Sequence, residues 1–163
     1  MEGELRIRSF EVGDQGQARQ LILEGLGEHF GYIDETLNPD LEDILHNYIL
    51  AGHTFVVICM GRELVGTGAL ISRGEGISEM VRISTRKTCR RRGIGQAIVT
   101  YLVNVARLRG DRRIIVKTNA TWHDAIHLYQ RLGFVEYGRT ALGVGLELLL
   151  AAPEQGAAAD KKP

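Results

Sequence analysis

This chain has few cysteines, no net charge and no long apolar run. Only two of the 163 residues are cysteines; Cys59 lies in an apolar run and Cys89 in an arginine cluster, so a disulfide framework is not expected. Lysine plus arginine equals aspartate plus glutamate at 20 each, and a neutral chain has no overall field that attracts nucleic acid or anionic membranes. No stretch approaches the length that spans a bilayer, and residues 1–6 lack a signal-peptide core. We therefore expect a cytoplasmic protein with no nucleic-acid or membrane partner.

What the chain does contain is the composition of one ordinary globular domain, 44% apolar and 25% charged. The spacing of apolar residues predicts an α/β order of elements. In chain order these are a strand at 4–10, helices at 14–26 and 38–51, strands at 54–60, 63–72 and 77–85, a helix at 94–109, a strand at 113–118, a helix at 121–132 and two strands within 134–150. Residues 27–37 are aperiodic and receive no assignment. This order indicates one domain over 1–150 around a mixed sheet, followed by a disordered tail at 151–163.

The most informative segment is a glycine-containing turn between a predicted strand and a predicted helix, Arg90-Arg91-Arg92-Gly93-Ile94-Gly95-Gln96. Free N–H groups and the dipole at a helix N-terminus bind phosphate oxygens. Gly93 and Gly95 allow the backbone to approach a ligand closely, and the arginines supply charge suited to a pyrophosphate. The dinucleotide fingerprint is excluded because its third glycine and later acidic residue are missing, and the Gly-Lys-Ser/Thr ending of a Walker loop is absent. A nucleic-acid site is disfavoured because no aromatic residues interleave with the arginines.

Three motifs in register resemble those of one enzyme family. Arg90-x-x-Gly93-x-Gly95 resembles the coenzyme A motif of the GNAT N-acetyltransferases. Upstream, residues 79–85 resemble that family's Glu-Leu-x-Arg-x-x-Val strand, and downstream Asn119 with residues 125–134 resembles its Asn and Ala-x-x-x-Tyr-x-x-x-Gly-Phe ending. The match covers residues 77–135. Thr85 and Lys87 depart from the valine and proline that the family more often has there.

The resemblance implies a GNAT-like α/β domain, with a mixed, mostly antiparallel sheet of about seven strands and about four flanking helices. It also implies acetyl-CoA as cosubstrate and an amine as acceptor. Backbone groups near Ile83 and Thr85 are implied to hold the pantetheine arm and acetyl carbonyl, and Asn119 and Tyr129 to flank the thioester. The residues implied to cradle the pyrophosphate are Arg90, Arg91, Arg92, Gly93, Ile94, Gly95 and Gln96. A homodimer stays open as the assembled state.

Tyr129 and Glu79 are the candidate catalytic residues. A tyrosine hydroxyl can protonate the thiolate released from a thioester. The helical spacing of Tyr129 with residues 125 and 132 by itself predicts a core residue, but the three motifs in register favour the catalytic role. Glu79 lies on a strand face that we expect it to share with Ile77, Val81, Ile83 and Thr85, where a carboxylate is costly unless hydrogen-bonded or functional. It is either a general base for the amine or a structural carboxylate paired with Arg82 or another arginine.

The acceptor is expected to border the unassigned segment. The candidate residues there are His29, Tyr32, Asp34 and Glu35. No metal site is expected, because His123 and His127 share a helix face without a third ligand, and Cys89 is not needed for direct acyl transfer. The expected function is acetyl transfer from acetyl-CoA to an unidentified primary amine in a ternary complex. The alternative is a non-catalytic coenzyme A-binding sensor or interaction module.

Overall fold

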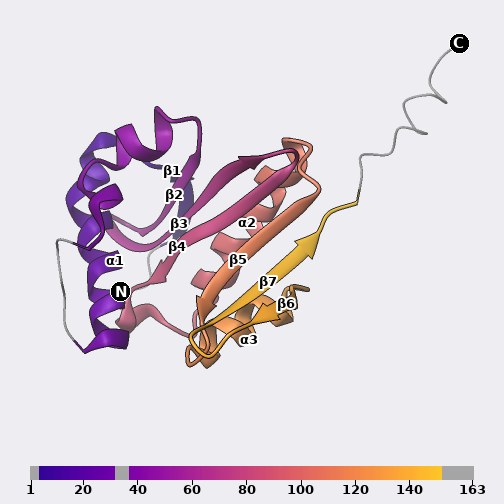
Figure 1. The fold of residues 1–163 in the computed structure, drawn as a ribbon. Coiled ribbons are helices and arrows are strands. Elements are labelled where there is room, and N and C mark those ends of the chain that lie inside the picture. Colours follow the sequence, from indigo (N-terminus) through magenta and orange to yellow (C-terminus); the bar gives the residue numbers. More distant parts are fainter. Residues whose placement is uncertain (1–3, 32–36, 152–163) are drawn as a thin grey trace, which may run out of the picture.

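The computed structural model describes residues 4–31 and 37–151, apart from the side chain of His29. Seven strands form one sheet in the order β1-β2-β3-β4-β5-β7-β6 (Figure 1). Their bounds are β1 Leu5–Ser9, β2 Thr54–Met60, β3 Glu63–Gly74, β4 Ile77–Thr85, β5 Arg113–Asn119, β6 Val135–Arg139 and β7 Gly143–Leu149. All neighbours are antiparallel except β4 and β5, which are parallel. The predicted fold class is confirmed.

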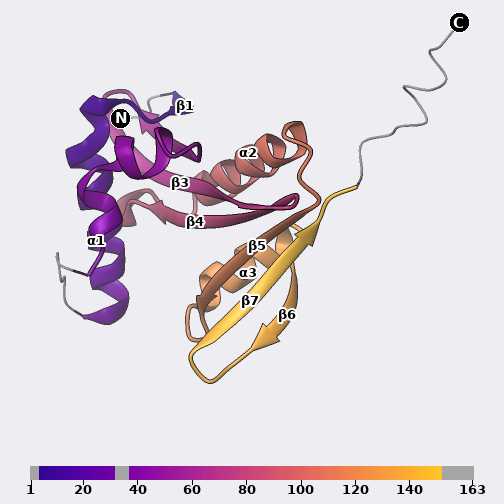
Figure 2. The ribbon, with the colours of Figure 1, turned by 45° about the horizontal axis from the view of Figure 1, so that its top comes forward.

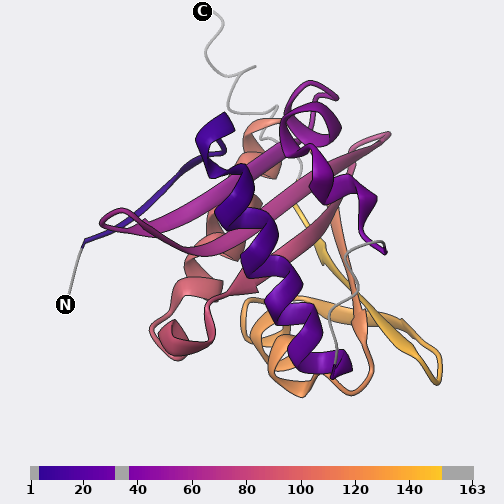
Figure 3. The same ribbon diagram turned by 90° about the vertical axis from the view of Figure 1, so that its left-hand side faces the viewer.

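Helices cover both faces of the sheet and enclose two separate cores. On one face α1 (Gln15–Phe30) crosses the strands of the β1–β4 half (Figure 3). Its Leu21 and Ile22 pack with Phe55 of β2 in a cluster that also includes Leu41 and Ile44. On the other face α2 (Ile94–Leu108) and α3 (His123–Arg131) pack on a cluster that runs from β2 to β7. Within the described residues, no helix is long and apolar enough to cross a bilayer.

Two expectations about the helices are wrong. The first helix does not end near residue 26 but continues to Phe30, where Gly31 adopts a left-handed φ of 80° and donates to Gly27 O at 2.7 Å. The helix expected over 38–51 is two short pieces, η2 (Pro39–Glu42) and η3 (Leu45–Ile49), separated by Asp43 at φ −146°. The side chain of Gln15 takes over the backbone groups at this break, donating to Leu41 O at 2.6 Å and accepting from Ile44 N at 3.0 Å. As predicted, the segment begins at Asn38-Pro39.

A bulge in β4 overturns the expectation of one continuous strand face. Arg82 has a left-handed φ of 57°, and the register against β3 shifts between the Thr67 and Ala69 positions. An extra residue in one strand reverses which side chains face each way. Val81 therefore packs against the α1 core, whereas Ile83 packs against the α2 core.

The two halves of the sheet separate beyond the bulge. Pairing of β4 with β5 covers only Ile77 to Met80, opposite Arg113 to Val116. Figure 2 shows β5, β7 and β6 turning away from β4 toward the C-terminal ends of the two parallel strands. Backbone groups of residues 81–85 that face the gap consequently have no ladder partner on β5.

Candidate active site

The arginine-rich turn leads from β4 through the single turn η4 (Lys87–Cys89) into α2. Gly93 is the N-cap at φ 76°, and no side chain caps the helix. The first backbone bond of the helix is from Ala97 N to Gly93 O at 2.9 Å, so the N–H groups before it are available to a ligand. Arg91 and Arg92 are exposed and have no ion-pair partner within the described residues. The turn that we predicted to bind an anion thus offers free N–H groups at a helix start and two exposed cations, features that favour anions.

Three elements converge at Gly95. A Cβ atom at this position would lie 3.2 Å from Leu128 Cδ2 of α3 and 3.8 Å from Thr85 Oγ1 at the end of β4. Glycine therefore allows α2 to begin in contact with both neighbours, beside the gap between the parallel strands. This contact brings the helix that carries Tyr129 to the start of the cradle.

Arg90 is engaged by another side chain. Its Nη1 and Nη2 donate to the two carboxylate oxygens of Glu28 on α1, each at 2.6 Å. This pairing raises the pKa of Arg90. A phosphate bound by Arg90 has to compete with Glu28, whereas Arg91 and Arg92 carry no such cost.

Tyr129 is buried on α3, and its ring lies 5.6 Å from the ring of Phe134. Burial raises the pKa of its hydroxyl well above the ordinary value, so it stays protonated at neutral pH. Within the described residues, this hydroxyl has no hydrogen-bond partner. Packing and an available donor are both present, so the core and catalytic interpretations of Tyr129 are compatible.

Glu79 is 7% exposed and lies in β4 opposite Ile115. Its partner is Arg73, not Arg82: Nε and Nη2 of Arg73 donate to Glu79 Oε1 at 3.0 and 2.8 Å. Both contacts use the same oxygen. Within the described part of the chain, Oε2 has no hydrogen-bond partner and is available to a water or an amine.

Arg82 instead binds Asp40 and so ties the bulge to η2. Its Nε and Nη2 donate to the Asp40 carboxylate at 3.0 and 2.7 Å, and Tyr48 Oη donates to the same carboxylate at 2.6 Å. Burial and this carboxylate raise the pKa of Tyr48 to about 12. Thr67 Oγ1 donates to Arg82 O at 2.8 Å from β3. The bulge is therefore fixed from both sides of the strand.

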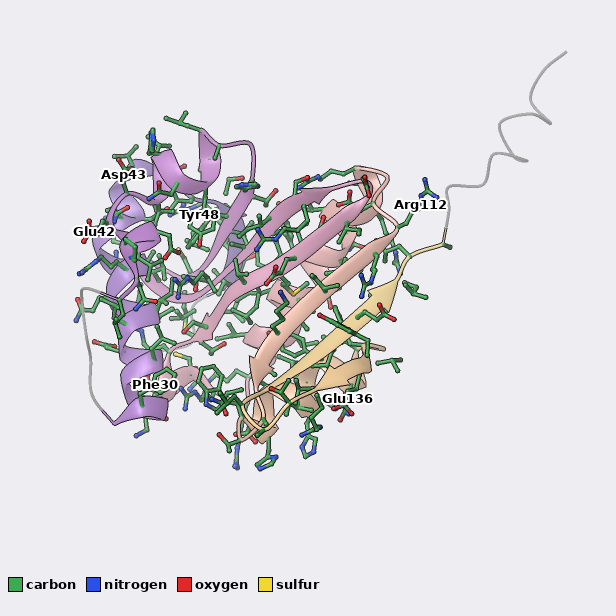
Figure 4. The ribbon with its side chains drawn as sticks, in the orientation of Figure 1. Phe30, Glu42, Asp43, Tyr48, Arg112 and Glu136 are labelled. Atoms are coloured by element: carbon green, nitrogen blue, oxygen red, sulfur yellow. The ribbon has the colours of Figure 1, made fainter. Side chains whose placement is uncertain are left out.

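Of the four predicted acceptor residues, Tyr32, Asp34 and Glu35 lie outside the described residues, as does the side chain of His29. A pocket of about 450 Å³ borders the end of α1 next to that segment. Its lining comes from α1, β5, the loop before α3 and the turn before β7: Phe30, Lys117, Thr118, Asn119, Trp122, Thr140, Leu142 and Gly143. Figure 4 shows Phe30 at the lower end of α1. Of these, sequence reasoning had singled out only Asn119, although the isolated Trp122 beside it was a usable signal.

The remaining residues that the sequence singled out are Asn119 and the two helix histidines, His123 and His127. Asn119 Oδ1 accepts from Thr121 N at 3.0 Å and from Thr121 Oγ1 at 2.8 Å, so part of its side chain shapes the turn before α3. The helix predicted over 121–132 begins later, at His123, and Trp122 is its N-cap. His123 and His127 are exposed, and the described residues contain no group of three side chains suited to a metal ion.

A mixed sheet that opens between two parallel strands, beside an uncapped and arginine-flanked helix N-terminus, places this chain in the acetyltransferase class of α/β folds. It belongs to the GNAT family: the profile described as "Acetyltransferase (GNAT) family" matches residues 19–134. It is 29% identical over 123 residues to rat N-acetyltransferase family 8 member 2, covering 72% of this chain and 54% of that protein. The chain thus spans about half the length of such curated relatives. It is 30% identical to the uncharacterized N-acetyltransferase YjgM of Escherichia coli K12, covering 77% of this chain and 75% of the other.

Solved structures agree in fold. An acetyltransferase of the GNAT family from Staphylococcus aureus Mu50 superposes with a TM-score of 0.81 at 21% identity, covering 91% of this chain and all of the other. The PaiA N-acetyltransferase from Thermoplasma acidophilum, solved in complex with coenzyme A, gives 0.80 at 14% identity, with 90% and 99% coverage. At these identities the likeness establishes the fold.

Proposed function

We propose that this protein is an N-acetyltransferase that moves the acetyl group of acetyl-CoA to a primary amine by direct attack in a ternary complex. The observation that carries the proposal is the opening between β4 and β5 beside the uncapped start of α2. One end of this arrangement suits a pyrophosphate and the other offers unpaired strand backbone. When bound, acetyl-CoA supplies an activated acyl group as its thioester.

In this proposal residues 90–96 hold the pyrophosphate, with Gly93, Ile94, Gly95 and Gln96 contributing backbone N–H groups. Backbone groups near Ile83 and Thr85 hold the arm and polarise the acetyl carbonyl, which favours charge development on its oxygen. Orientation of the two reactants in one gap accounts for much of the rate gain.

Two side chains handle protons. Glu79, through Oε2, accepts the proton that the amine loses on attack. Tyr129 donates a hydrogen bond to the departing sulfur. A thiol has a pKa of about 8.5, and the pKa of Tyr129 is raised above its ordinary value of about 10. Complete proton transfer from Tyr129 is therefore unfavourable, and its contribution is stabilisation of the charged sulfur. Asn119, at the end of β5, orients the same end of the ligand.

The cradle is tested by Gly93→Val. Gly93 has a positive φ and no atom near its Cβ position, so valine adds local backbone strain and obstructs a ligand rather than the core. We expect coenzyme A to raise the Tm of the wild type and to leave that of the variant unchanged. Release of free thiol from acetyl-CoA in the presence of a mixed amine panel should fall in parallel.

Gly74→Val is the matched control, because Gly74 also has a positive φ and open space around its Cβ position but lies in the β3–β4 turn. This variant should keep the coenzyme A shift after its own loss of stability is subtracted. An unchanged shift in Gly93→Val refutes the cradle. Binding without thiol release for every amine refutes transfer and favours the non-catalytic module.

A further inference from the structure

The pocket at the end of α1 has an exposed apolar side. The rings of Phe30 and Trp122 meet edge to face, with centroids 5.7 Å apart at 62°. Phe30 is 53% exposed and Leu142 is 81% exposed. Covering such surface is favourable, and aromatic faces add a preference for planar groups. This side of the pocket suits an apolar or aromatic group of a ligand.

The same pocket presents a cation. Lys117 is exposed, and among residues 4–31 and 37–151 it has no carboxylate partner; the described residues that line the pocket include no acidic side chain. Two arginines of β3 and β5 are paired instead, Arg73 with Glu79 and Arg113 with Glu147. An ammonium group beside apolar surface is complemented by an anionic ligand group, which forms charge-assisted hydrogen bonds with it.

The register of the β4–β5 pair places Lys117 on the same face of the sheet as Glu79, the proposed base. Glu79 lies opposite Ile115 in the parallel pair, and Lys117 follows two residues later on β5. Side chains at i and i+2 of a strand share a face, so Lys117 lies on the face that carries Glu79, at the end where β4 and β5 separate. A ligand in the pocket consequently extends toward the gap.

We infer that the acceptor is an amino acid with a free carboxylate and an apolar or aromatic side chain. This inference rests on the proposed function. The carboxylate pairs with Lys117, the side chain lies against Phe30 and Trp122, and the amine points toward Glu79. In the transfer, the amine nitrogen bonds to the acetyl carbon and the carbon–sulfur bond breaks. The nitrogen gives its proton to Glu79, which releases it to solvent. The sulfur leaves as a thiolate that accepts a hydrogen bond from Tyr129 and then takes a proton from water, so the products are an N-acetyl amino acid and free coenzyme A.

Trp122 makes the inference testable without turnover. It is the only tryptophan of the chain, so intrinsic tryptophan fluorescence reports on this pocket directly. The protein is titrated in the presence of coenzyme A, which has no acetyl group to transfer, with L-phenylalanine, L-phenylalaninamide or glycine. We expect saturable change with phenylalanine, at least tenfold weaker binding of the amide, which lacks the carboxylate, and no saturable change with glycine, which lacks the ring.

The variant Lys117→Met keeps the length of the side chain and removes its charge. It should bring phenylalanine binding down to the level of the amide. Arg107→Met, which removes an exposed cation from the last turn of α2, should leave both titrations unchanged. With acetyl-CoA present, mass spectrometry should detect N-acetylphenylalanine from the wild type and little from Lys117→Met.

Equal binding of phenylalanine and its amide overturns the inference, as does tighter binding of the amide, which would indicate a peptide N-terminus. Absence of any fluorescence change, in protein that still gives the coenzyme A shift, also overturns it. Failure of the proposed function looks different: phenylalanine and its amide are discriminated by Trp122 fluorescence, but no amine is acetylated. That result retains the ligand class of the pocket and refutes transfer.

Discussion

At the scale of single residues, Glu79 is the side chain whose environment most directly suggests chemistry. It is buried, its Oε1 accepts both hydrogen bonds from Arg73, and its Oε2 has no hydrogen-bond partner among the described residues and can accept a proton. Glu79→Gln keeps the shape and removes the base. An alkylamine has a pKa near 10 and must lose a proton before or during attack, so turnover at neutral pH should fall by about a hundredfold or more. The measurement is kcat against pH, in which the wild type should have an acidic limb that the variant lacks.

Cofactor binding is the control that separates a catalytic from a structural role of Glu79. The glutamine of Glu79→Gln still accepts a hydrogen bond from Arg73, so this variant should retain the KM for acetyl-CoA and the coenzyme A thermal shift. Arg73→Gln provides the comparison, because it removes the partner and leaves the carboxylate. If Glu79→Gln keeps the wild-type rate and pH profile, the base is a water or another residue.

At the scale of elements, the position of α2 on the sheet depends on two glycines of β3, Gly66 and Gly68, because α2 side chains lie where their Cβ atoms would be. A Cβ atom at Gly68 would lie 2.4 Å from Ile98 Cγ2 and 2.9 Å from Ile83 Cδ1. Gly68→Ala therefore overpacks the α2 interface and should lower the free energy of unfolding by about 1–3 kcal/mol. Chemical denaturation measures this change, and the coenzyme A shift should weaken because α2 carries the cradle.

A glycine-to-alanine substitution in α1 should change the free energy of unfolding in the opposite direction. Nothing lies within 4 Å of a Cβ atom at Gly16, and alanine is favoured over glycine in a helix. Gly16→Ala should thus leave the free energy of unfolding unchanged or raise it by about 0.5 kcal/mol. A loss in Gly68→Ala no larger than that in Gly16→Ala would mean that α2 can shift to accommodate a methyl group.

Comparison of elements also separates what the sequence could predict from what it could not. The cradle was predictable because glycines and arginines before a helix are a local pattern. The order of elements along the chain followed from apolar spacing, except where a long-range contact intervened. Gln15 replaces backbone bonds at the break before Ile44, and the bulge at Arg82 depends on Asp40, which is 42 residues away in sequence.

Side-chain pairing was likewise beyond local patterns. Glu79 was expected to pair with Arg82 or another arginine, and the bulge decides that it is Arg73, because it turns Arg82 toward Asp40. The pocket lining comes from four separate segments, so no motif contains it. Only the fold brings Phe30 and Lys117 to one place.

At the scale of the whole molecule, two carboxylates fasten the α1 layer to the sheet. Asp14 accepts from Arg8 of β1 at 2.7 and 2.9 Å and from Glu11 N at 2.8 Å, while Asp40 binds Arg82 of β4. Burial alone raises the pKa of Asp14, but these hydrogen bonds outweigh it and hold the pKa below its ordinary value. Burial likewise raises the pKa of Asp40, but its hydrogen bonds to Arg82 and Tyr48 lower that pKa by more, so the net change is a decrease.

These depressed pKa values predict how stability depends on acidity. A carboxylate with a lower pKa in the folded state stabilises that state above its unfolded pKa of about 3.9, and the contribution is lost as pH falls through the folded value. The free energy of unfolding should therefore be level near neutral pH and decline below about pH 4. Asp14→Asn removes the buried charge that pairs with Arg8 and leaves Arg8 with the longer ion pair to Glu11 at 3.8 Å, so it should cost about 1–3 kcal/mol at pH 7. That difference should shrink as pH falls below 4 and should disappear only below the depressed pKa of the folded carboxylate, where the wild-type side chain is also neutral. Urea denaturation at a series of pH values measures both effects, with Asp124→Asn on the exposed first turn of α3 as a control that should follow the wild type. A constant gap between wild type and Asp14→Asn at every pH would show that Asp14 acts through packing rather than through its charge.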